Sequence, residues 1–318
     1  MKQLLIFVSL VWLSCSPVDA VELGFSGMTQ INEHAYLVVL DKKVFHQGER
    51  VGILNIGKHG KQKFKQVTIA DWRDDDGQAS DLESVCKLPQ TDDEYLLAES
   101  GYWHGKFGRI FHIQLQQQQA KVLHVYHLPN YVSNSEQVDG DNFEGLECVA
   151  HGQQTYLVLG ERGGSELYRS GLLRLGLLNA DKTQVDWQSY ADNALPVSAP
   201  GQWHNVDGKR SISDLYLDPQ GTLWAVATED AGDQGPFRSV IYAAAKLVVP
   251  TAEQPLPLQL TTPTQAQWVV DGFKVEALAA PTQRINNSVM SFGTEDEDFG
   301  GVWRVLFAPL ENSAQMVK

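Results

Sequence analysis

The chain has 318 residues, and its 39 Asp and Glu against 25 Lys and Arg give a formal net charge of −14. This balance argues against electrostatic binding of nucleic acid or anionic lipid, because both need a basic face on the protein. A hydrophobic fraction of 43% with 20% charged residues is typical of a globular chain and excludes a largely disordered one.

The first twenty residues have the features of a cleaved secretory signal. Lys2 precedes an apolar run from Leu4 to Leu13, and the segment Pro17 to Ala20 places short side chains before a cut after Ala20. A lipoprotein cut before Cys15 is the alternative. No other apolar run approaches the ~20 residues needed to cross a bilayer. We therefore expect an exported protein, periplasmic or secreted, with no membrane span.

Five segments of the remaining chain repeat one pattern. Each begins with a short strand that opens at a small or acidic residue, continues through a turn, and ends with a stronger apolar strand that closes on an acid. The equivalent opening residues are Ser26, Glu83, Glu144, Ser213 and Glu276, at intervals of 57 to 69 residues. A near-constant period of this length indicates that one supersecondary unit is repeated around a common structure.

Two further strands follow each pair, as the alternating segments 109–115 and 121–128 illustrate for the second repeat. Four antiparallel strands per repeat predict an all-β fold, a β-propeller of five blades in one domain spanning residues 21–318. A propeller of six blades remains an alternative if the longest interval contains a degenerate blade. The last repeat lacks a fourth strand, which either residues 21–25 or the C-terminal tail would supply.

Two cysteines remain after the predicted cleavage, Cys86 and Cys148. They form one disulfide if the fold brings them together, as an oxidising compartment allows. Two buried thiols are the alternative.

In a propeller the first strand of each blade lines the central channel, so equivalent acids from different blades meet around one axis. Glu83, Glu144 and Glu276 form such a ring, with Asp214 one residue out of register; the second-strand acids that form another are Asp41, Glu99, Glu161, Glu229 and Glu295. Facing carboxylates must bind a cation, pair with basic side chains or take up protons. Ca²⁺ suits them because it accepts six to eight oxygen ligands. We expect it on Glu83, Glu144, Asp214, Glu276, Glu99 and Glu295; the alternative is that these acids cap strand ends or pair with arginines.

Basic and loop residues are candidates to hold a substrate at the same mouth. Arg162, Arg210 and Arg238 could bind a phosphate or balance the acids. His104 and His204 lie in Gly-rich or polar loops that could line a funnel.

Five motif blocks in fixed order resemble the phytase-like propeller family, whose members are described as esterase-like. The blocks are Asp81-Leu82-Glu83-Ser84-Val85, Asn142-Phe143-Glu144-Gly145-Leu146, Ile212-Ser213-Asp214-Leu215, Val275-Glu276-Ala277-Leu278-Ala279 and Glu295-Asp296-Glu297-Asp298-Phe299. The resemblance spans roughly residues 22–308, although Ser84 and Ala277 replace glycines of the family pattern. It implies a propeller fold, export and hydrolysis of ester bonds.

Two functions follow from these features. The first is hydrolysis of small phosphate or carboxylate esters, with Ca²⁺ polarising the ester and Glu161 or Glu229 acting as the base. The second is a non-catalytic, ligand- or protein-binding propeller in which the cation is structural. In either case we expect a monomer that does not bind nucleic acid.

Overall fold

The computed structural model describes residues 23–42, 50–74, 77–103, 106–129, 142–163, 170–206, 208–229, 231–250 and 257–309. The predicted signal segment, residues 1–20 with Cys15, lies outside the described residues, as do Val21 and Glu22. Among the described residues no helix is long and apolar enough to span a bilayer.

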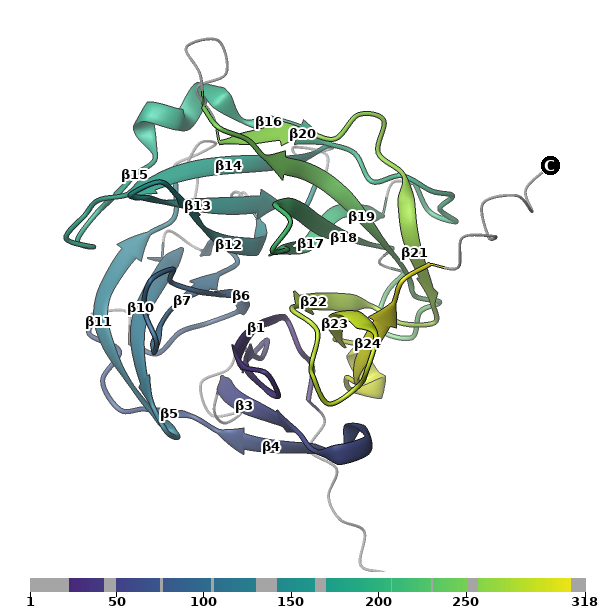
Figure 1. Cartoon of the computed structure of the whole chain (residues 1–318), viewed down its shortest axis with the longest axis horizontal. Coiled ribbons are helices and arrows are strands. Elements are labelled where there is room, and N and C mark those ends of the chain that lie inside the picture. The colour runs from purple at the N-terminus through teal and green to yellow at the C-terminus, as the bar shows by residue number, and fades with distance from the viewer. Residues whose placement is uncertain are drawn as a thin grey trace, which may run out of the picture.

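Five sheets radiate from a central axis as the blades of a propeller (Figure 1). Blade one contains β1 (Gly27–Asn32), β2 (Ala35–Val39), β3 (Val51–Ile56) and β4 (Gln62–Gln66). Blade two contains β6 (Leu82–Lys87), β7 (Glu94–Glu99), β10 (Arg109–Gln116), β11 (Gln119–His127) and the parallel addition β5 (Thr68–Ile69). Blade three contains β12 (Phe143–His151), β13 (Gln154–Glu161), β14 (Gly171–Leu178), β15 (Val185–Asp186) and β16 (Leu195–Val197).

Blade four contains β17 (Lys209–Leu217), β18 (Thr222–Glu229), β19 (Arg238–Leu247), β20 (Leu258–Leu260) and β21 (Ala266–Asp271), and blade five contains β22 (Val275–Ala279), β23 (Ser288–Thr294) and β24 (Trp303–Phe307). A small hairpin, β8 (Tyr102–Trp103) with β9 (Lys106–Phe107), and the 3-10 turns η2 (Lys58–Gly60), η3 (Gln188–Asn193) and η4 (Glu297–Phe299) complete the described elements. The prediction of an all-β, five-bladed propeller is confirmed, and a sixth blade in the third interval is excluded because that interval forms the outer strands of blade three.

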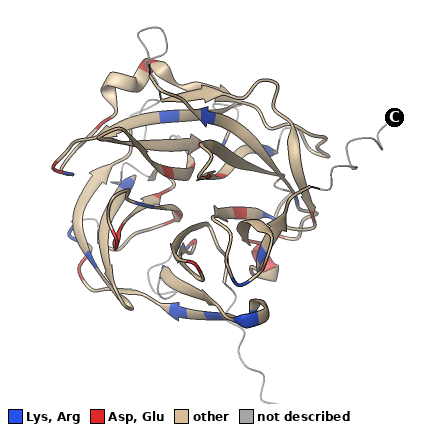
Figure 2. Ribbon diagram, in the orientation of Figure 1, with Lys and Arg blue, Asp and Glu red and all other residues tan. Residues whose placement is uncertain are grey.

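The strands nearest the axis are β1, β6, β12, β17 and β22 (Figure 1). The early residues of β6, β12, β17 and β22 line one cavity and their later residues line another, so these four strands run in the same direction along the channel. Acidic segments of several blades face the central opening (Figure 2). Residues at equivalent positions of the five repeats therefore meet at one mouth of the channel.

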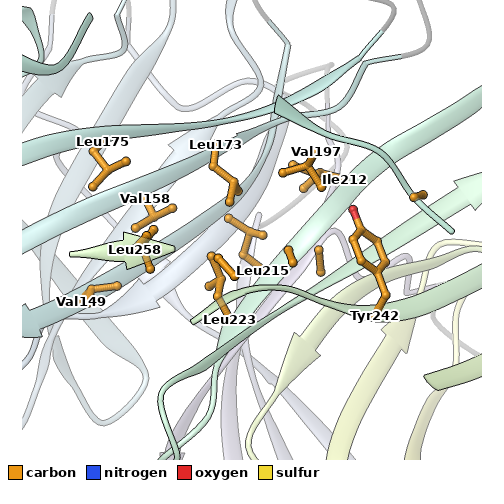
Figure 3. Packing of buried hydrophobic residues seen from close by; sticks show 14 of the residues in the cluster. Val149, Val158, Leu173, Leu175, Val197, Ile212, Leu215, Leu223, Tyr242 and Leu258 are labelled. Atoms are coloured by element: carbon orange, nitrogen blue, oxygen red, sulfur yellow. The ribbon is translucent and has the colours of Figure 1, made fainter. Parts of the chain in front are cut away.

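The second strand of each blade packs against both neighbouring blades, which explains its uninterrupted apolar sequence. In β2, Leu37 and Val39 pack towards blade two, while Tyr36 and Val38 pack towards blade five. Figure 3 shows one of these layers, between blades three and four, where Val158 and Leu173 lie with Leu223. Because successive side chains of a strand point to opposite faces, each blade contributes to two hydrophobic cores, one with each neighbouring blade. Such cores therefore lie between all neighbouring blades of the ring.

The N-terminal segment closes the ring against blade five. The backbone N–H of Phe25 donates to the carbonyl of Thr294 at 3.0 Å. Residues 23–25 form no strand, so among the described residues blade five has three strands. Residues 21–22 and 310–318, the other candidates for its fourth strand, lie outside the described part of the chain.

We expect Gly301→Ala to lower the free energy of unfolding by about 1–3 kcal/mol, the usual cost of forcing extra volume into a packed site. A methyl group at Gly301 would overlap the carbonyl oxygens of Thr294 and Leu23, and backbone atoms cannot move aside as a side chain tip can. Urea unfolding is the measurement. Gly57→Ala is the control, because Gly57 has φ −83° and its added carbon would come no closer than 3.3 Å to another residue. Equal stability of the two variants would contradict the proposed close approach.

Cys86 in β6 and Cys148 in β12 form a disulfide between the innermost strands of blades two and three, with Cα atoms 5.6 Å apart. The first of the two alternatives for these cysteines is therefore the observed one. Since Glu83 and Glu144 lie on the same two strands, the bond also fixes their relative positions.

Candidate functional site

A cavity of about 220 Å³ opens where the innermost strands begin. Charged and amide side chains line it: Asp41, Asp81, Glu83, Asn142, Glu144, Arg162, Arg210, Lys274, Glu276, Glu295 and Glu297. The predicted ring of Glu83, Glu144 and Glu276 is therefore present in the structure. Seven carboxylates against three basic side chains leave the cavity with an excess of negative charge when all are ionised.

One side of the cavity, from blades one and two, holds a compact group of three carboxylates. Asp41, Asp81 and Glu83 each offer an oxygen, and the three oxygens lie within 4.8 Å of one another. The hydroxyl of Ser100 donates to Asp81 Oδ2 at 2.6 Å. Burial, followed by the charges of Glu144, Asp81 and Asp41, raises the pKa of Glu83 well above its usual range.

This carboxylate group fits a hard divalent cation. Ca²⁺ binds oxygen at 2.3–2.6 Å, so two ligands of one ion are at most about 5 Å apart. The 4.8 Å limit for Asp41, Asp81 and Glu83 satisfies that condition. Their oxygens are also the ligand type that Ca²⁺ prefers, while a soft metal would need sulfur or imidazole.

The other side of the cavity, from blades three to five, is a continuous chain of ion pairs. Arg162 Nη1 lies 3.2 Å from Glu144 Oε1, and Arg210 Nη1 lies 3.8 Å from Glu144 Oε2 and 3.2 Å from Glu276 Oε1. Lys274 Nζ continues the chain, at 3.2 Å from Glu276 Oε1. Three blades are thus joined through alternating charges at the mouth.

Lys274 is the most deeply buried cation of this chain, with 4% of its side chain exposed. It also donates to Glu295 Oε2 at 2.8 Å and to Glu297. Burial by itself would lower the pKa of Lys274, but the charges of Glu276 and Glu295 hold it above its usual value. Burial raises the pKa of Glu276, and Lys274 and Arg210 only partly oppose this.

Arg162 differs from the other two cations because 31% of its side chain is exposed, against 16% for Arg210. Among the described residues its guanidinium donates through Nη1, to Glu144 Oε1 at 3.2 Å and to the side-chain amide oxygen of Asn142 at 3.3 Å. In the same amide orientation Asn142 donates to Glu144 Oε1 at 2.9 Å. No other acceptor in the described part of the chain contacts the Arg162 guanidinium.

The structure does not bring Glu99, Glu161 and Glu229 into the cavity, so the expected second ring is not formed. Glu99 accepts from Arg109 Nη2 at 2.6 Å and Nε at 3.0 Å, and Glu161 accepts from Arg174 Nε at 3.0 Å. Second strands lie one strand spacing, about 4.8 Å, farther from the axis. A carboxylate buried there needs a basic or N–H partner within its own blade. Glu99, Glu161 and Glu229 therefore match the alternative interpretation, in which the acids cap strand ends or pair with basic side chains. Of the five second-strand acids, Asp41 and Glu295 line the cavity.

Glu229 is likewise paired outside the cavity, in this case with a histidine. Its buried carboxylate accepts from the backbone N–H of Asn205 and lies 3.1 Å from His204 Nδ1. The His204 side chain is 70% exposed. Neither residue lines the cavity, which corrects the expectation that Glu229 and His204 lie at this mouth.

Asp214 lies deeper in the channel wall than the ring it was expected to join. Its Oδ2 accepts from the backbone N–H of Leu278 at 2.6 Å, which connects blades four and five. Burial raises the pKa of Asp214 well above its usual range. Glu147 connects blades three and four in the same way, accepting from Leu217 N–H at 2.8 Å. A one-residue shift along a strand turns the side chain away from the mouth, so Asp214 serves as a link between blades.

Of the remaining candidates, Arg238 pairs with Asp271 at 2.8 Å outside the cavity, and His104 lies outside the described residues. Sequence reasoning missed Asp81, Asn142, Lys274 and Glu297 as site residues. Asp81, Asn142 and Lys274 stand two positions before Glu83, Glu144 and Glu276 in three different repeats. That shared offset was the available signal for them.

No family model matches the chain, and no curated protein matches it. Solved structures do match. One titled "Glycoside hydrolase" is 11% identical over 92% of this chain and 61% of that chain, with a TM-score of 0.50. A thermostable family-43 glycoside hydrolase is 8% identical over 93% of both chains, with a TM-score of 0.49. A Bombyx mori GH32 beta-fructofuranosidase is 11% identical over 91% of this chain and 62% of that one, with a TM-score of 0.45.

At 11% identity and a TM-score of 0.50, the first of these likenesses concerns the fold alone and not the chemistry of the site. The chain spans about three fifths of the length of the first of these proteins. Function therefore has to be inferred from the cavity itself.

Proposed function

We propose that the protein hydrolyses small phosphate or carboxylate esters in this cavity, with Ca²⁺ held by Asp41, Asp81 and Glu83. The observation that carries the proposal is that three carboxylates close enough together to hold a cation and a partly exposed arginine line the same small cavity. Bound Ca²⁺ would supply positive charge that polarises an ester oxygen. It would also offset the negative charge of the cavity, which otherwise repels an anionic substrate.

The side chains of the protein have distinct tasks in this proposal. Arg162 binds an anionic oxygen of the substrate through the N–H groups that Glu144 leaves available. Glu144 is the base, because it is the cavity carboxylate bonded to Arg162 and so lies next to the bound anion. Arg210 and Lys274 position Glu144 and Glu276. Glu161 and Glu229 have no role in the reaction, since both are engaged outside the cavity.

The order of the five motif blocks supports the further proposal that the chain is a phytase-like propeller. Three acids of these blocks, Glu83, Glu144 and Glu276, line the cavity together, as one site assembled from separate repeats requires. Export and a monomeric state are part of the same proposal.

We expect Glu83→Gln to lower kcat/KM by about 10²-fold or more with Ca²⁺ present, the scale for losing one group that stabilises developing charge. The assay is a panel of nitrophenyl phosphates and acetates, with Ca²⁺ and with a chelator, alongside calorimetric titration of Ca²⁺. Glu33→Gln, an exposed acid outside the cavity, is the matched control. No turnover of any panel ester by the Ca²⁺-loaded parent would refute the hydrolase. Undiminished Ca²⁺ affinity in Glu83→Gln would refute the proposed metal site.

A second candidate is a non-catalytic propeller whose cation is structural. The chain of ion pairs favours it, because Arg210 and Lys274 are each held by at least two carboxylates and tie three blades together. In that case Ca²⁺ raises the melting temperature of the parent, the chelator lowers it, and no ester is turned over under either condition.

A further inference from the structure

A basic row lies on the outer edge of blade one, in a chain that is otherwise acidic. Residues 50–70 contain Arg50, Lys58, Lys61, Lys63 and Lys65 and no Asp or Glu. We call Lys58, Lys61, Lys63 and Lys65 the lysine row. Lys58, Lys61 and Lys63 are exposed and Lys65 is half-buried. Figure 2 shows blue stretches on β4 and the adjoining turn η2. The positive charge of this face is therefore local and continuous.

The backbone arranges the row as a line. β4 is the outermost strand of blade one, in the order β1-β2-β3-β4. Lys63 lies opposite Asn55 and Lys65 lies opposite Ile53. Both lysines are on one face of β4, and Gln62 and Phe64 are on the other. Alternate residues of a strand are about 6.8 Å apart. Lys63 and Lys65 thus project from the same face of β4 about 6.8 Å apart, and Lys61 directly precedes the strand.

The described residues do not neutralise this line. No carboxylate among them forms an ion pair with a lysine of the row. At physiological ionic strength a charge acts over only about 8 Å, so a local row is felt by a nearby partner despite the net charge of −14. The row is therefore complementary to a partner that carries negative charges along a line.

We propose that the lysine row binds a linear acidic polysaccharide. Nucleic acid is disfavoured because the aromatic residue of β4 cannot stack on bases: Phe64 packs inward, where a methyl group on Gly52 would overlap its ring. A bilayer is disfavoured because no exposed large hydrophobic side chain lies within residues 50–70 to insert into it. This surface does not depend on the proposed hydrolase activity.

Lysines on an edge strand also have a simpler use, which is to prevent pairing with the edge of another sheet. That use and polysaccharide binding differ in what removal of the charge does. If the row only protects the edge, its loss causes self-association and leaves polymer binding unchanged. If the row is a binding surface, its loss weakens binding in proportion to the charges removed.

The test compares the parent with a Lys61→Gln, Lys63→Gln, Lys65→Gln variant for binding to polygalacturonate at low salt. The control variant, Lys106→Gln, Lys121→Gln, Lys246→Gln, loses the same charge from exposed lysines scattered over other blades. We expect the row variant to bind at least tenfold more weakly, since each lysine facing an anionic surface contributes about fivefold in affinity. The control should bind within about twofold of the parent, and binding by the parent should weaken as salt is added.

A variant with arginine at positions 61, 63 and 65 keeps the charge and should retain binding even if the glutamine variant self-associates. Equal loss in the scattered control would overturn the proposal, as would a parent that does not bind polygalacturonate. Binding by the parent to poly(dT) or to phosphatidylserine vesicles in its place would also overturn it. Self-association of the row variant with unchanged polymer binding would leave edge protection as the role of the lysines.

Discussion

Replacing Lys274 by methionine is expected to lower the free energy of unfolding by about 3–5 kcal/mol at pH 8, the usual cost of removing one partner from a buried ion pair. The Lys274 side chain is 4% exposed, and its ammonium lies 3.2 Å from Glu276 and 2.8 Å from Glu295. Methionine keeps the length and apolar stem of the side chain but leaves Glu276 buried beside other carboxylates, with Arg210 as its remaining basic partner among the described residues. Urea unfolding, followed by tryptophan fluorescence, measures the loss.

The same variant should recover much of its stability as the pH falls. In the parent, the pKa of Lys274 is raised, so its contribution is complete below its unfolded pKa and is lost only as the pH rises through the higher folded value. The folded pKa of Glu276 is already raised, so ionising it costs stability as the pH rises from its unfolded value towards the folded one. Without Lys274 that cost grows, and protonation at pH 5 relieves it. A loss of equal size at pH 5 and pH 8 would contradict this account.

A Lys274→Met, Glu276→Gln double variant separates charge from packing. If the loss comes from the Glu276 carboxylate, which keeps Arg210 but no longer has Lys274, the second substitution restores a large part of the stability at pH 8. If the loss comes from packing around the methylene stem, the double variant is no more stable than Lys274→Met.

Removing the disulfide with Cys86→Ser and Cys148→Ser is expected to cost about 4 kcal/mol, because the bond closes a long loop in the unfolded chain. The two cysteines are 62 residues apart in sequence and join the innermost strands of blades two and three. Chemical denaturation of the double variant, and of the parent with and without reductant, measures the effect. Reduced parent and double variant should unfold at the same denaturant concentration. An unchanged midpoint for both would show that the bond contributes nothing to stability.

The repeated strand pairs were predictable because their sequence reflects where they pack. Second strands such as Tyr36–Val39 and Tyr95–Ala98 are apolar without interruption, since each faces a neighbouring blade on both sides. The spacing between repeats then predicted that Glu83, Glu144 and Glu276 meet, and they do. The spacing of the repeats along the sequence was therefore enough to predict which glutamates lie together in the ring.

The partners of the acids were not predictable in the same way. Glu99 and Glu295 occupy equivalent positions at the ends of second strands, yet Glu99 pairs with Arg109 inside its blade and Glu295 lines the cavity with Lys274. Which of them reaches the axis depends on basic residues elsewhere in each blade. Asp214 shows a further limit, because one residue of offset placed it against Leu278 N–H and away from the mouth.

The sequence by itself determined the repeated four-stranded unit, the innermost strands and the three glutamates that share a mouth, because hydrophobic alternation and a regular period are local properties of the chain. Only the tertiary structure decided which carboxylates remain at the cavity, that Asp41 and Asp81 join Glu83, and that Cys86 bonds Cys148. Ion pairs, ligand groups and disulfides depend on distances between residues far apart in sequence. The packing of the closed ring sets those distances.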